Sequence, residues 1–174
     1  MNIFGIEGWG KNIDWVKSAK SQDNYRVVKM ILESCQMLCT NLNYLYGEQV
    51  APYRSCHLNH PSTKWARESS ANFLSLVEHT GAMLTEYKLR FNNRTHKCEA
   101  VLERCVELFD EKLFDNHEPT PLPLAMPEKY KSEDIVESYR KFYASKPRIR
   151  YPEGKVPVWF RKYRGDEPYE ITNQ

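Results

Sequence analysis

The spacing of apolar residues along the chain predicts a protein built mostly of helices. Between residues 23 and 46, apolar side chains recur every three or four positions, which is the period of one helix face. Asp23 is a favourable N-cap, and Gly47 is a favourable residue for ending a helix. The opposite, polar face of this predicted helix carries Arg26, Lys29, Glu33 and Gln36. The pattern therefore predicts one long amphipathic helix early in the chain.

Two further helices are predicted in the middle of the chain. One begins near Pro61, a residue favoured in the first helical turn, and its apolar stripe continues to Phe91. Gly81 lies within that stripe and is expected to bend the helix. The other helix spans about residues 95–114, where apolar positions again recur at helical spacing.

Proline and basic residues distinguish the C-terminal part of the chain. Residues 115–131 contain four prolines and are expected to follow an extended path over the surface. Ser132-Glu133-Asp134 then marks the start of another helix, because it combines a capping residue with acids in the first turn, and this helix runs to about Ala144. Residues 145–174 are predicted to form an irregular tail rich in basic and aromatic side chains.

The N-terminal residues 1–22 are predicted to form an arm. Within it, Ile3 and Phe4 are compatible with a short strand or with an extended segment packed on the core. The chain shows neither an internal repeat nor a second apolar core. The expected fold class is therefore mainly α, a compact helical bundle that forms a single domain over residues 1–174.

Composition narrows the classes of protein that fit this chain. The 174 residues are 41% hydrophobic, which suffices for one core, and the formal net charge is only +2. Affinity for an anionic partner must therefore come from local clusters of cations. No apolar run is long enough to cross a bilayer, and the first residues lack the features of a secretory signal. The odd count of five cysteines favours reduced, buried thiols in a cytosol-like compartment.

The densest group of candidate ligand-binding residues lies where a loop meets the helix predicted from Pro61. A helix N-terminus offers free backbone N–H groups and the positive end of the helix dipole, which suit an anion. The side chains proposed here as ligand groups are Asn59, His60, Ser62, Thr63, Lys64 and Arg67. The alternative is an ordinary N-cap followed by a solvated charged face. Trp65 is expected to point toward the core in either case.

A second candidate group is the polar face of the first long helix, with Arg26, Lys29 and Glu33. Lys29 and Glu33 stand four residues apart and can simply pair with each other on a solvated surface. If the rest of the protein covers this face, the same residues become ligand groups. A desolvated Lys29 beside a carboxylate would also be a possible amine nucleophile.

The third candidate group lies in the C-terminal region, where cations alternate with aromatic residues. Tyr139, Arg140 and Tyr143 open this stretch, and further lysines, arginines and aromatics follow to Arg164. Such a mixture suits phosphates together with stacked bases. The alternative is a basic arm that its own aromatic residues pack across the protein, or that contacts another subunit.

Several common chemistries have no matching motif in the chain. There is no Walker loop, dinucleotide glycine fingerprint, nucleophile elbow or zincin sequence. Cys56, His57 and His60 lie close together, but the paired ligand spacing of structural zinc sites is absent. We therefore predict no metal, no cofactor and no complete set of catalytic residues.

Short stretches in a fixed order resemble a family of small phage and bacterial helical proteins that are often labelled as similar to the pyrimidine-dimer DNA glycosylases of T-even phages. The stretches are Met1-Asn2-Ile3-Phe4, Val27-Val28-Lys29-Met30-Ile31-Leu32-Glu33 with Gln36, Asn59-His60-Pro61 with Trp65, Arg67, Glu68 and Ser69, Thr95-His96-Lys97, Ala125-Met126-Pro127-Glu128 with Tyr130, Tyr139-Arg140 with Tyr143, Val156-Pro157 and Trp159-Phe160. The resemblance implies a compact helical fold, base flipping, and lyase chemistry through an amine and a glutamate. It also implies the cytoplasm of an infected bacterial host as the place of action.

The chain departs from that glycosylase pattern at its first residues. The pattern uses an exposed N-terminal amine on a small residue, whereas this chain begins Met1-Asn2. A retained scaffold without the catalytic feature favours binding over turnover. The leading hypothesis is therefore a phage anti-defence protein, expected to be a homo-oligomer, that sequesters a nucleotide or cyclic dinucleotide signal without cleaving it. The alternative is a DNA glycosylase and abasic-site lyase acting on damaged pyrimidines. A third class is a virion or partner-binding protein with no small ligand.

Overall fold

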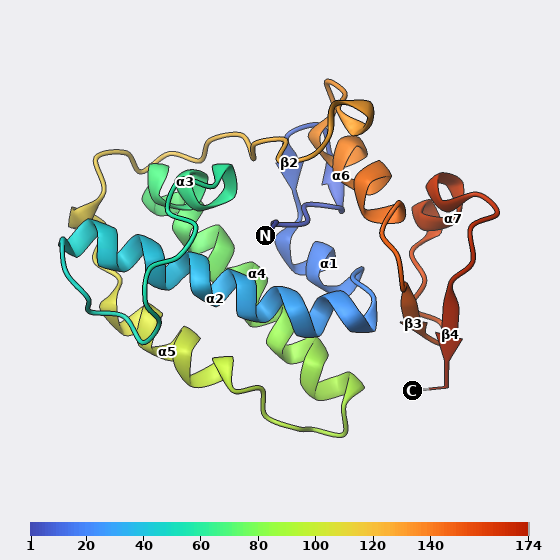
Figure 1. Ribbon diagram of the computed structural model, residues 1–174, viewed down its shortest axis with the longest axis horizontal. Coiled ribbons are helices and arrows are strands. Elements are labelled where there is room, and N and C mark those ends of the chain that lie inside the picture. Colours follow the sequence, from blue (N-terminus) through green and yellow to red (C-terminus); the bar gives the residue numbers. More distant parts are fainter. Residues whose placement is uncertain (174) are drawn as a thin grey trace.

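The computed structural model describes residues 1–173 and has a mainly α architecture in which one long helix is central (Figure 1). This helix, α2 (Asn24–Tyr46), matches the predicted span of residues 23–46. The Asp23 side chain accepts a hydrogen bond from the Tyr25 N–H, and Gly47 ends the helix in the left-handed conformation at φ 74°. Both ends are thus fixed by local capping, which explains why the sequence predicted them.

The region predicted as one helix from Pro61 to Phe91 forms two helices, α3 (Pro61–Glu68) and α4 (Ser70–Arg90). The break falls at Ser69, whose backbone is extended at φ −151°, ψ 156°, and Gly81 lies inside the continuous helix α4. The helix is therefore interrupted at Ser69 and not at Gly81. Ser69 separates the helices because its hydroxyl accepts from the Asn72 N–H, so it caps α4.

The helix predicted over residues 95–114 is shorter in the structure, where α5 spans Cys98–Leu108. Phe109 leaves the helical conformation, and a 3₁₀ turn, η1 (Glu111–Leu113), follows with Asp110 as its N-cap. The connector over residues 115–131 then takes the extended path predicted for it, passing α3 on its way to α6 (Figure 1). It is interrupted only by a second 3₁₀ turn, η2 (Glu128–Tyr130).

The C-terminal tail is more regular than predicted. After α6 (Ile135–Ala144), strand β3 (Arg150–Pro152) pairs in parallel with strand β4 (Glu170–Thr172), and α7 (Val158–Arg164) lies between them in sequence. The irregular tail of the prediction was thus wrong for these spans, and Gln174 lies outside the described residues. The buried guanidinium of Arg164 donates to the backbone carbonyls of Ala144, Lys146 and Pro168, which closes the segment on itself.

The N-terminal arm packs against the helices through its apolar side chains. Ile3, Phe4 and Ile6 are at most 3% exposed, and Ile3 and Phe4 belong to no strand, so the packed-segment alternative is correct. A small antiparallel hairpin follows, formed by β1 (Gly8–Trp9) and β2 (Asn12–Ile13), and leads into the short helix α1 (Trp15–Lys20). The N-terminal arm is therefore packed into the core, and it precedes the first long helix in the chain.

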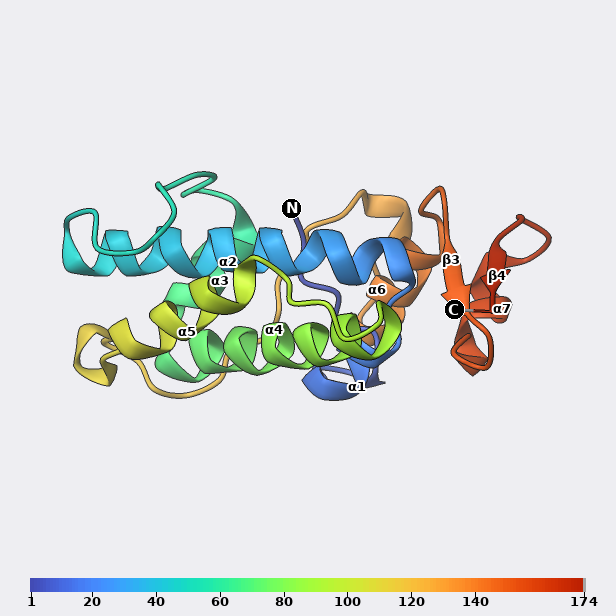
Figure 2. The ribbon, with the colours of Figure 1, turned by 90° about the horizontal axis from the view of Figure 1, so that it is seen from below.

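The core lies between α2 and the helices packed on it, mainly α4, α3 and α5. Seen from below, α2 forms an upper layer over α4 and α5, and the tail with β3, β4 and α7 lies beyond the N-terminal end of α2 (Figure 2). Within residues 1–173, no helix combines the length and apolar character that crossing a membrane requires.

Candidate functional site

Four of the predicted ligand-binding residues are buried inside the protein. Ser62 and Thr63 are fully buried on the inner side of α3, and Trp65 is buried beside them as predicted. Tyr139 and Tyr143 are also fully buried, and their hydroxyls donate to the Pro123 carbonyl and to the Asp23 carboxylate. These side chains face the interior, so we remove them from the candidate site.

Two of the predicted arginines fix the backbone of other segments. Arg26, 6% exposed, donates to the carbonyls of Pro147 and Arg148 at 2.7 and 3.1 Å and lies 3.5 Å from Asp23. Arg140 donates from Nε to the Ile6 carbonyl at 2.7 Å and pairs with Glu7 at 3.1 Å. Arg26 therefore holds the start of the tail against α2, and Arg140 holds the N-terminal arm against α6.

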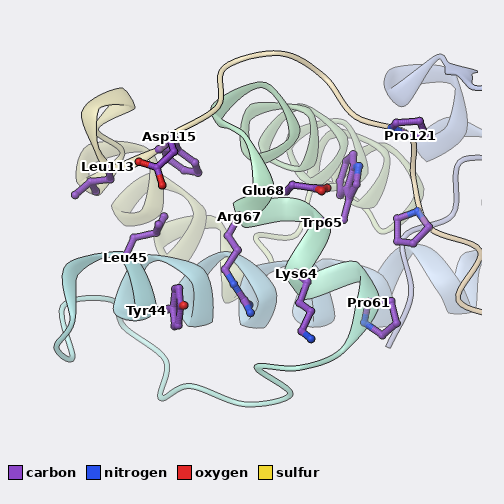
Figure 3. A pocket seen from close by; sticks show the side chains of 12 residues that line it. Tyr44, Leu45, Pro61, Lys64, Trp65, Arg67, Glu68, Leu113, Asp115 and Pro121 are labelled. Atoms are coloured by element: carbon purple, nitrogen blue, oxygen red, sulfur yellow. The ribbon is translucent and has the colours of Figure 1, made fainter.

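Lys64 and Arg67 line a hollow of about 740 Å³ beside α3. Figure 3 shows both side chains projecting from α3 over α2, with Tyr44 beside Arg67. The Arg67 guanidinium lies 4.6 Å from the Tyr44 ring centre and donates to the Leu58 carbonyl at 2.8 Å. Burial lowers the pKa of Arg67, and Tyr44 opposes that shift. Glu68 and Asp115 line the same hollow, so it holds as many acids as cations and favours no anion.

Lys29 and Glu33 line a different, smaller hollow of about 100 Å³, together with Met1, Arg26 and Lys146. The α-amino nitrogen of Met1 lies 3.5 Å from Glu33 Oε2, and Lys29 Nζ lies 3.5 Å from Glu33 Oε1. The side chains of Met1 and Glu33 are only 5% and 14% exposed, whereas that of Lys29 is 55% exposed. The Met1 amine and the half-buried Glu33 carboxylate thus face each other, with an exposed lysine beside them.

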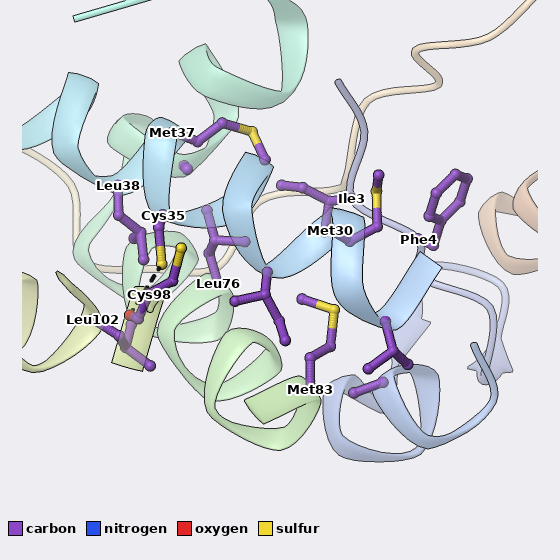
Figure 4. Packing of buried hydrophobic residues seen from close by; sticks show 14 of the residues in the cluster. Ile3, Phe4, Met30, Cys35, Met37, Leu38, Leu76, Met83, Cys98 and Leu102 are labelled. Carbon is purple, nitrogen blue, oxygen red and sulfur yellow. Dashed lines mark hydrogen bonds between the residues drawn. The ribbon is translucent and has the colours of Figure 1, made fainter. Parts of the chain in front are cut away.

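Packing of the N-terminal arm places the Met1 amine at this position. Figure 4 shows Ile3 and Phe4 beside Met30 of α2, one helical turn before Glu33. The Phe4 ring meets the Tyr143 ring of α6 edge-to-face at 5.0 Å between centroids. On the other side, Thr63 contacts the Met1 sulfur at 3.7 Å. The arm is therefore held between α2, α6 and α3, and its first residue ends beside Glu33.

The electrostatic environment of the hollow is positive. Its charged groups are the Met1 amine, Arg26, Lys29 and Lys146, against the single carboxylate of Glu33. Burial lowers the pKa of Lys146, the positive charges of Arg26 and Lys29 lower it further, and Glu33 opposes them. Burial also lowers the pKa of His60, and the charge of the chain's amino terminus and of His57 add to that effect. His60 is thus electrostatically coupled to the amine, although its Nδ1 serves as the α3 cap for the Ser62 N–H.

The Glu33 carboxylate is incompletely hydrogen-bonded. Its Oε2 atom is buried and has no hydrogen-bond partner among residues 1–173, although it faces the Met1 amine. Asn2 Oδ1, from another residue lining the hollow, is likewise buried and without a partner in that part of the chain. Buried acceptors normally have hydrogen-bond partners, and exceptions of this kind are found at reactive or ligand-binding positions. The hollow can therefore supply a nucleophilic nitrogen and an adjacent proton acceptor.

The cysteines are free thiols, as the odd count predicted. Cys35, Cys39, Cys98 and Cys105 are buried between α2 and α5, and Cys56 is half-buried in the loop after α2. Figure 4 shows the Cys35 sulfur facing Cys98, where it donates to the Cys98 carbonyl at 3.7 Å. Across the described residues, no cluster of three or more His, Cys, Asp or Glu side chains is arranged to hold a metal ion.

Sequence reasoning placed Lys29 and Glu33 correctly beside each other but missed the two amines that join them. Neither the Met1 amine nor Lys146 stands out by sequence, because one belongs to the backbone and the other lies in a basic tail. The apolar residues of the arm were the available signal, since a packed arm must place the amine against the core. Exposed Asn59 and half-buried His60 lie in the loop before α3 and do not line this hollow.

Comparisons of the chain with protein-family models, with curated proteins and with solved structures found no match. The geometry of the amine and carboxylate is therefore the basis for interpreting the site.

Proposed function

We propose that the protein acts on damaged DNA as a glycosylase and abasic-site lyase, with the α-amino group of Met1 as its nucleophile. The observation that carries this proposal is the 3.5 Å approach of the Met1 amine to Glu33 inside a hollow whose other charged groups are cations. An amine attacks carbon only in its neutral form, so it needs a neighbouring group that accepts its proton. Of the three classes of function expected from the sequence, the glycosylase and lyase is the one that this pairing of amine and carboxylate supports best.

The lyase reaction can be written with the groups that line the hollow. The neutral amine adds to C1′ of the ring-opened abasic sugar, which is an aldehyde, and the carbonyl oxygen leaves as water to give an imine. Loss of a proton from C2′ then breaks the C3′–O bond and releases the phosphate on that side of the sugar. Glu33 is the carboxylate in the hollow that can accept these protons. The volume of about 100 Å³ suits the small reacting end of a sugar better than a base.

Three amines in the hollow compete for this role. As a class, α-amino groups lose their proton near pH ~8 and lysine side chains near pH ~10, so an α-amino group is the better nucleophile at neutral pH. Lys29 is largely exposed, which keeps its ammonium group hydrated. Lys146 has a lowered pKa and its ammonium lies 3.6 Å from the Phe142 ring centre, so it is the second amine that an experiment must distinguish.

The experiment is borohydride trapping on an oligonucleotide that carries one abasic site. The wild-type protein should give a covalent adduct, and peptide mapping should place the adduct on residue 1. Glu33→Gln should slow adduct formation by about 100-fold or more, the usual effect of removing a general base. Glu107→Gln is the matched control, because Glu107 is an exposed glutamate on α5 that pairs with Arg104.

The role of Met1 has its own control. Intact-mass measurement must show a free amine on residue 1, and a Gly-Ser extension ahead of Met1 should abolish trapping by moving the amine out of the hollow. An adduct on Lys29 or Lys146 would overturn the assignment to Met1. Absence of any adduct would overturn the lyase proposal and return preference to sequestration, in which a nucleotide disappears from solution and reappears unchanged after heat denaturation.

A further inference from the structure

A larger hollow adjoins the one that holds Met1 and Glu33. It has a volume of about 800 Å³ and lies between the first turns of α2, Phe91 at the end of α4, and the β3–β4 ladder of the tail. Tyr25 and Lys29 line both hollows, so the two are neighbours along the N-terminal part of α2. This volume is within the usual range of small-ligand sites, whereas the smaller hollow admits only a small group.

The larger hollow has an apolar, aromatic part. The Tyr25 and Val28 side chains are 49% and 38% exposed, and the half-buried Phe91 lies across from them. The Arg26 guanidinium lies 5.3 Å from the Tyr25 ring centre. An exposed aromatic ring in a concave site offers a surface on which a flat ring can stack, and such stacking is tolerant of base identity.

The rest of the lining is predominantly basic. Lys29 and Arg148 line the hollow, and Arg148 is exposed and forms no ion pair with any of residues 1–173. Arg150 also lines it but is paired with Glu170 at 2.6 Å. One arginine and one partly engaged lysine are therefore available to an anionic ligand next to the aromatic part.

The structure holds the backbone of Arg148 in a defined turn. Its backbone is left-handed at φ 56°, a conformation that residues other than glycine adopt rarely. The carbonyls of Pro147 and Arg148 both accept from the buried Arg26 guanidinium, which therefore stabilises this turn. A strained turn supported from inside is typical of a residue kept in place for a purpose.

We propose that the larger hollow binds a nucleoside phosphate, with its base stacked on Tyr25 and its phosphate bound by Arg148 and Lys29. If the ligand is a nucleotide of the DNA strand beside the abasic sugar, the inference rests on the proposed lyase function. A free nucleotide has the same chemistry and would fit the sequestration hypothesis. The pocket itself depends on neither function.

The test measures binding separately from chemistry and has two arms. In the first, anisotropy of a labelled duplex that carries a tetrahydrofuran abasic analogue reports DNA binding, because this analogue has no aldehyde and cannot form an imine. In the second, equilibrium dialysis measures binding of free mononucleotides and cyclic dinucleotides. The variants are Tyr25→Ala and Arg148→Ala, with Tyr46→Ala and Arg104→Ala as controls at exposed positions outside the hollow.

Tyr25→Ala should weaken binding at least about fivefold, as expected for loss of one base stack. Arg148→Ala should reduce the slope of log affinity against log salt concentration by about one. If the variants weaken binding of the duplex alone, the ligand is DNA. If they weaken binding of mononucleotides or cyclic dinucleotides, the ligand is a free nucleotide. The proposed binding site would be refuted if both variants bind both kinds of ligand with wild-type affinity. It would also be refuted if the wild-type protein binds neither.

These outcomes separate this inference from the proposed function. Borohydride trapping without an effect of Tyr25→Ala or Arg148→Ala would leave the lyase standing and remove the pocket. Nucleotide binding that depends on both residues, without any borohydride trapping, would support the binding site and refute the lyase. Thermal unfolding of each variant identifies a loss of binding that comes from unfolding instead.

Discussion

Replacing Tyr143 with phenylalanine should destabilise the junction between α2, α6 and the tail. The Tyr143 hydroxyl donates to Asp23 Oδ1 at 2.6 Å and accepts from the Asp23 backbone N–H at 2.7 Å. Both residues are fully buried. Phenylalanine keeps the packing of the ring but leaves a carboxylate oxygen and a backbone N–H without this partner.

The size of the effect follows from the two lost hydrogen bonds. A hydrogen bond to a charged group contributes about 1.5–3 kcal/mol, and a buried N–H left without a partner costs about 1–3 kcal/mol. Arg26 lies 3.5 Å from the same Asp23 oxygen and can offset part of the loss. We therefore expect the free energy of unfolding to fall by about 2–4 kcal/mol, which lowers Tm by roughly 5–15 °C in a protein of this size.

Urea unfolding followed by circular dichroism measures this loss, and the denaturant slope should stay unchanged if the folded state is intact. Tyr163→Phe is the control, because the half-buried Tyr163 hydroxyl has a distant contact of 3.5 Å with Glu137. Its effect should stay within about 0.5 kcal/mol. If Tyr143→Phe is equally neutral, the Asp23 junction does not stabilise the fold and the reasoning above is refuted.

Three other measurements test the buried groups. Burial raises the pKa of Tyr139, Tyr143 and Tyr151. The stability that depends on their neutral form is therefore complete below pH ~10 and is lost as pH rises further. An absorbance titration should show these three rings ionising only when the protein unfolds. Burial lowers the pKa of His79 to about 4. The stability that depends on its neutral form is therefore complete above pH ~6.5 and is lost toward pH ~4, by about 3 kcal/mol at most. His79→Gln should remove this dependence of the unfolding free energy on pH. In native protein, a thiol reagent should label half-buried Cys56 quickly and the four buried cysteines only after unfolding; rapid labelling of all five would contradict their placement.

The predictable parts of the fold are those that local capping determines. The bounds of α2 follow from Asp23 and Gly47, which act within one turn of the helix they delimit. The break at Ser69 was not predictable from spacing, because the apolar stripe continues from α3 into α4. Its position is supported by a bond from the Ser70 N–H to the Asn116 carbonyl, a residue far along the chain. Contacts of this kind leave no periodic trace in the sequence.

The candidate site, like the fold, was predictable only in part. Residue type and spacing identified Lys29 and Glu33, which stand four apart on one helix face. The same reasoning also selected Thr63 and Tyr143, whose polar atoms are directed to partners inside the protein. Sequence gives the chemistry that a side chain can perform, but burial decides whether a ligand can reach it. That decision depends on which faces of α3 and α6 are covered.

Packing of the arm, and not the ion pair, keeps the Met1 amine beside Glu33. A partly exposed ion pair contributes about 0–1 kcal/mol, whereas full burial of one large apolar side chain contributes about 1.5–3 kcal/mol. Ile3, Phe4 and Ile6 are all buried, so their combined contribution exceeds that of the pair several times. It follows that Glu33→Gln removes the proton acceptor while the amine stays in place. A loss of trapping in that variant would therefore report on chemistry, whereas Phe4→Ala would displace the amine and lose trapping together with stability.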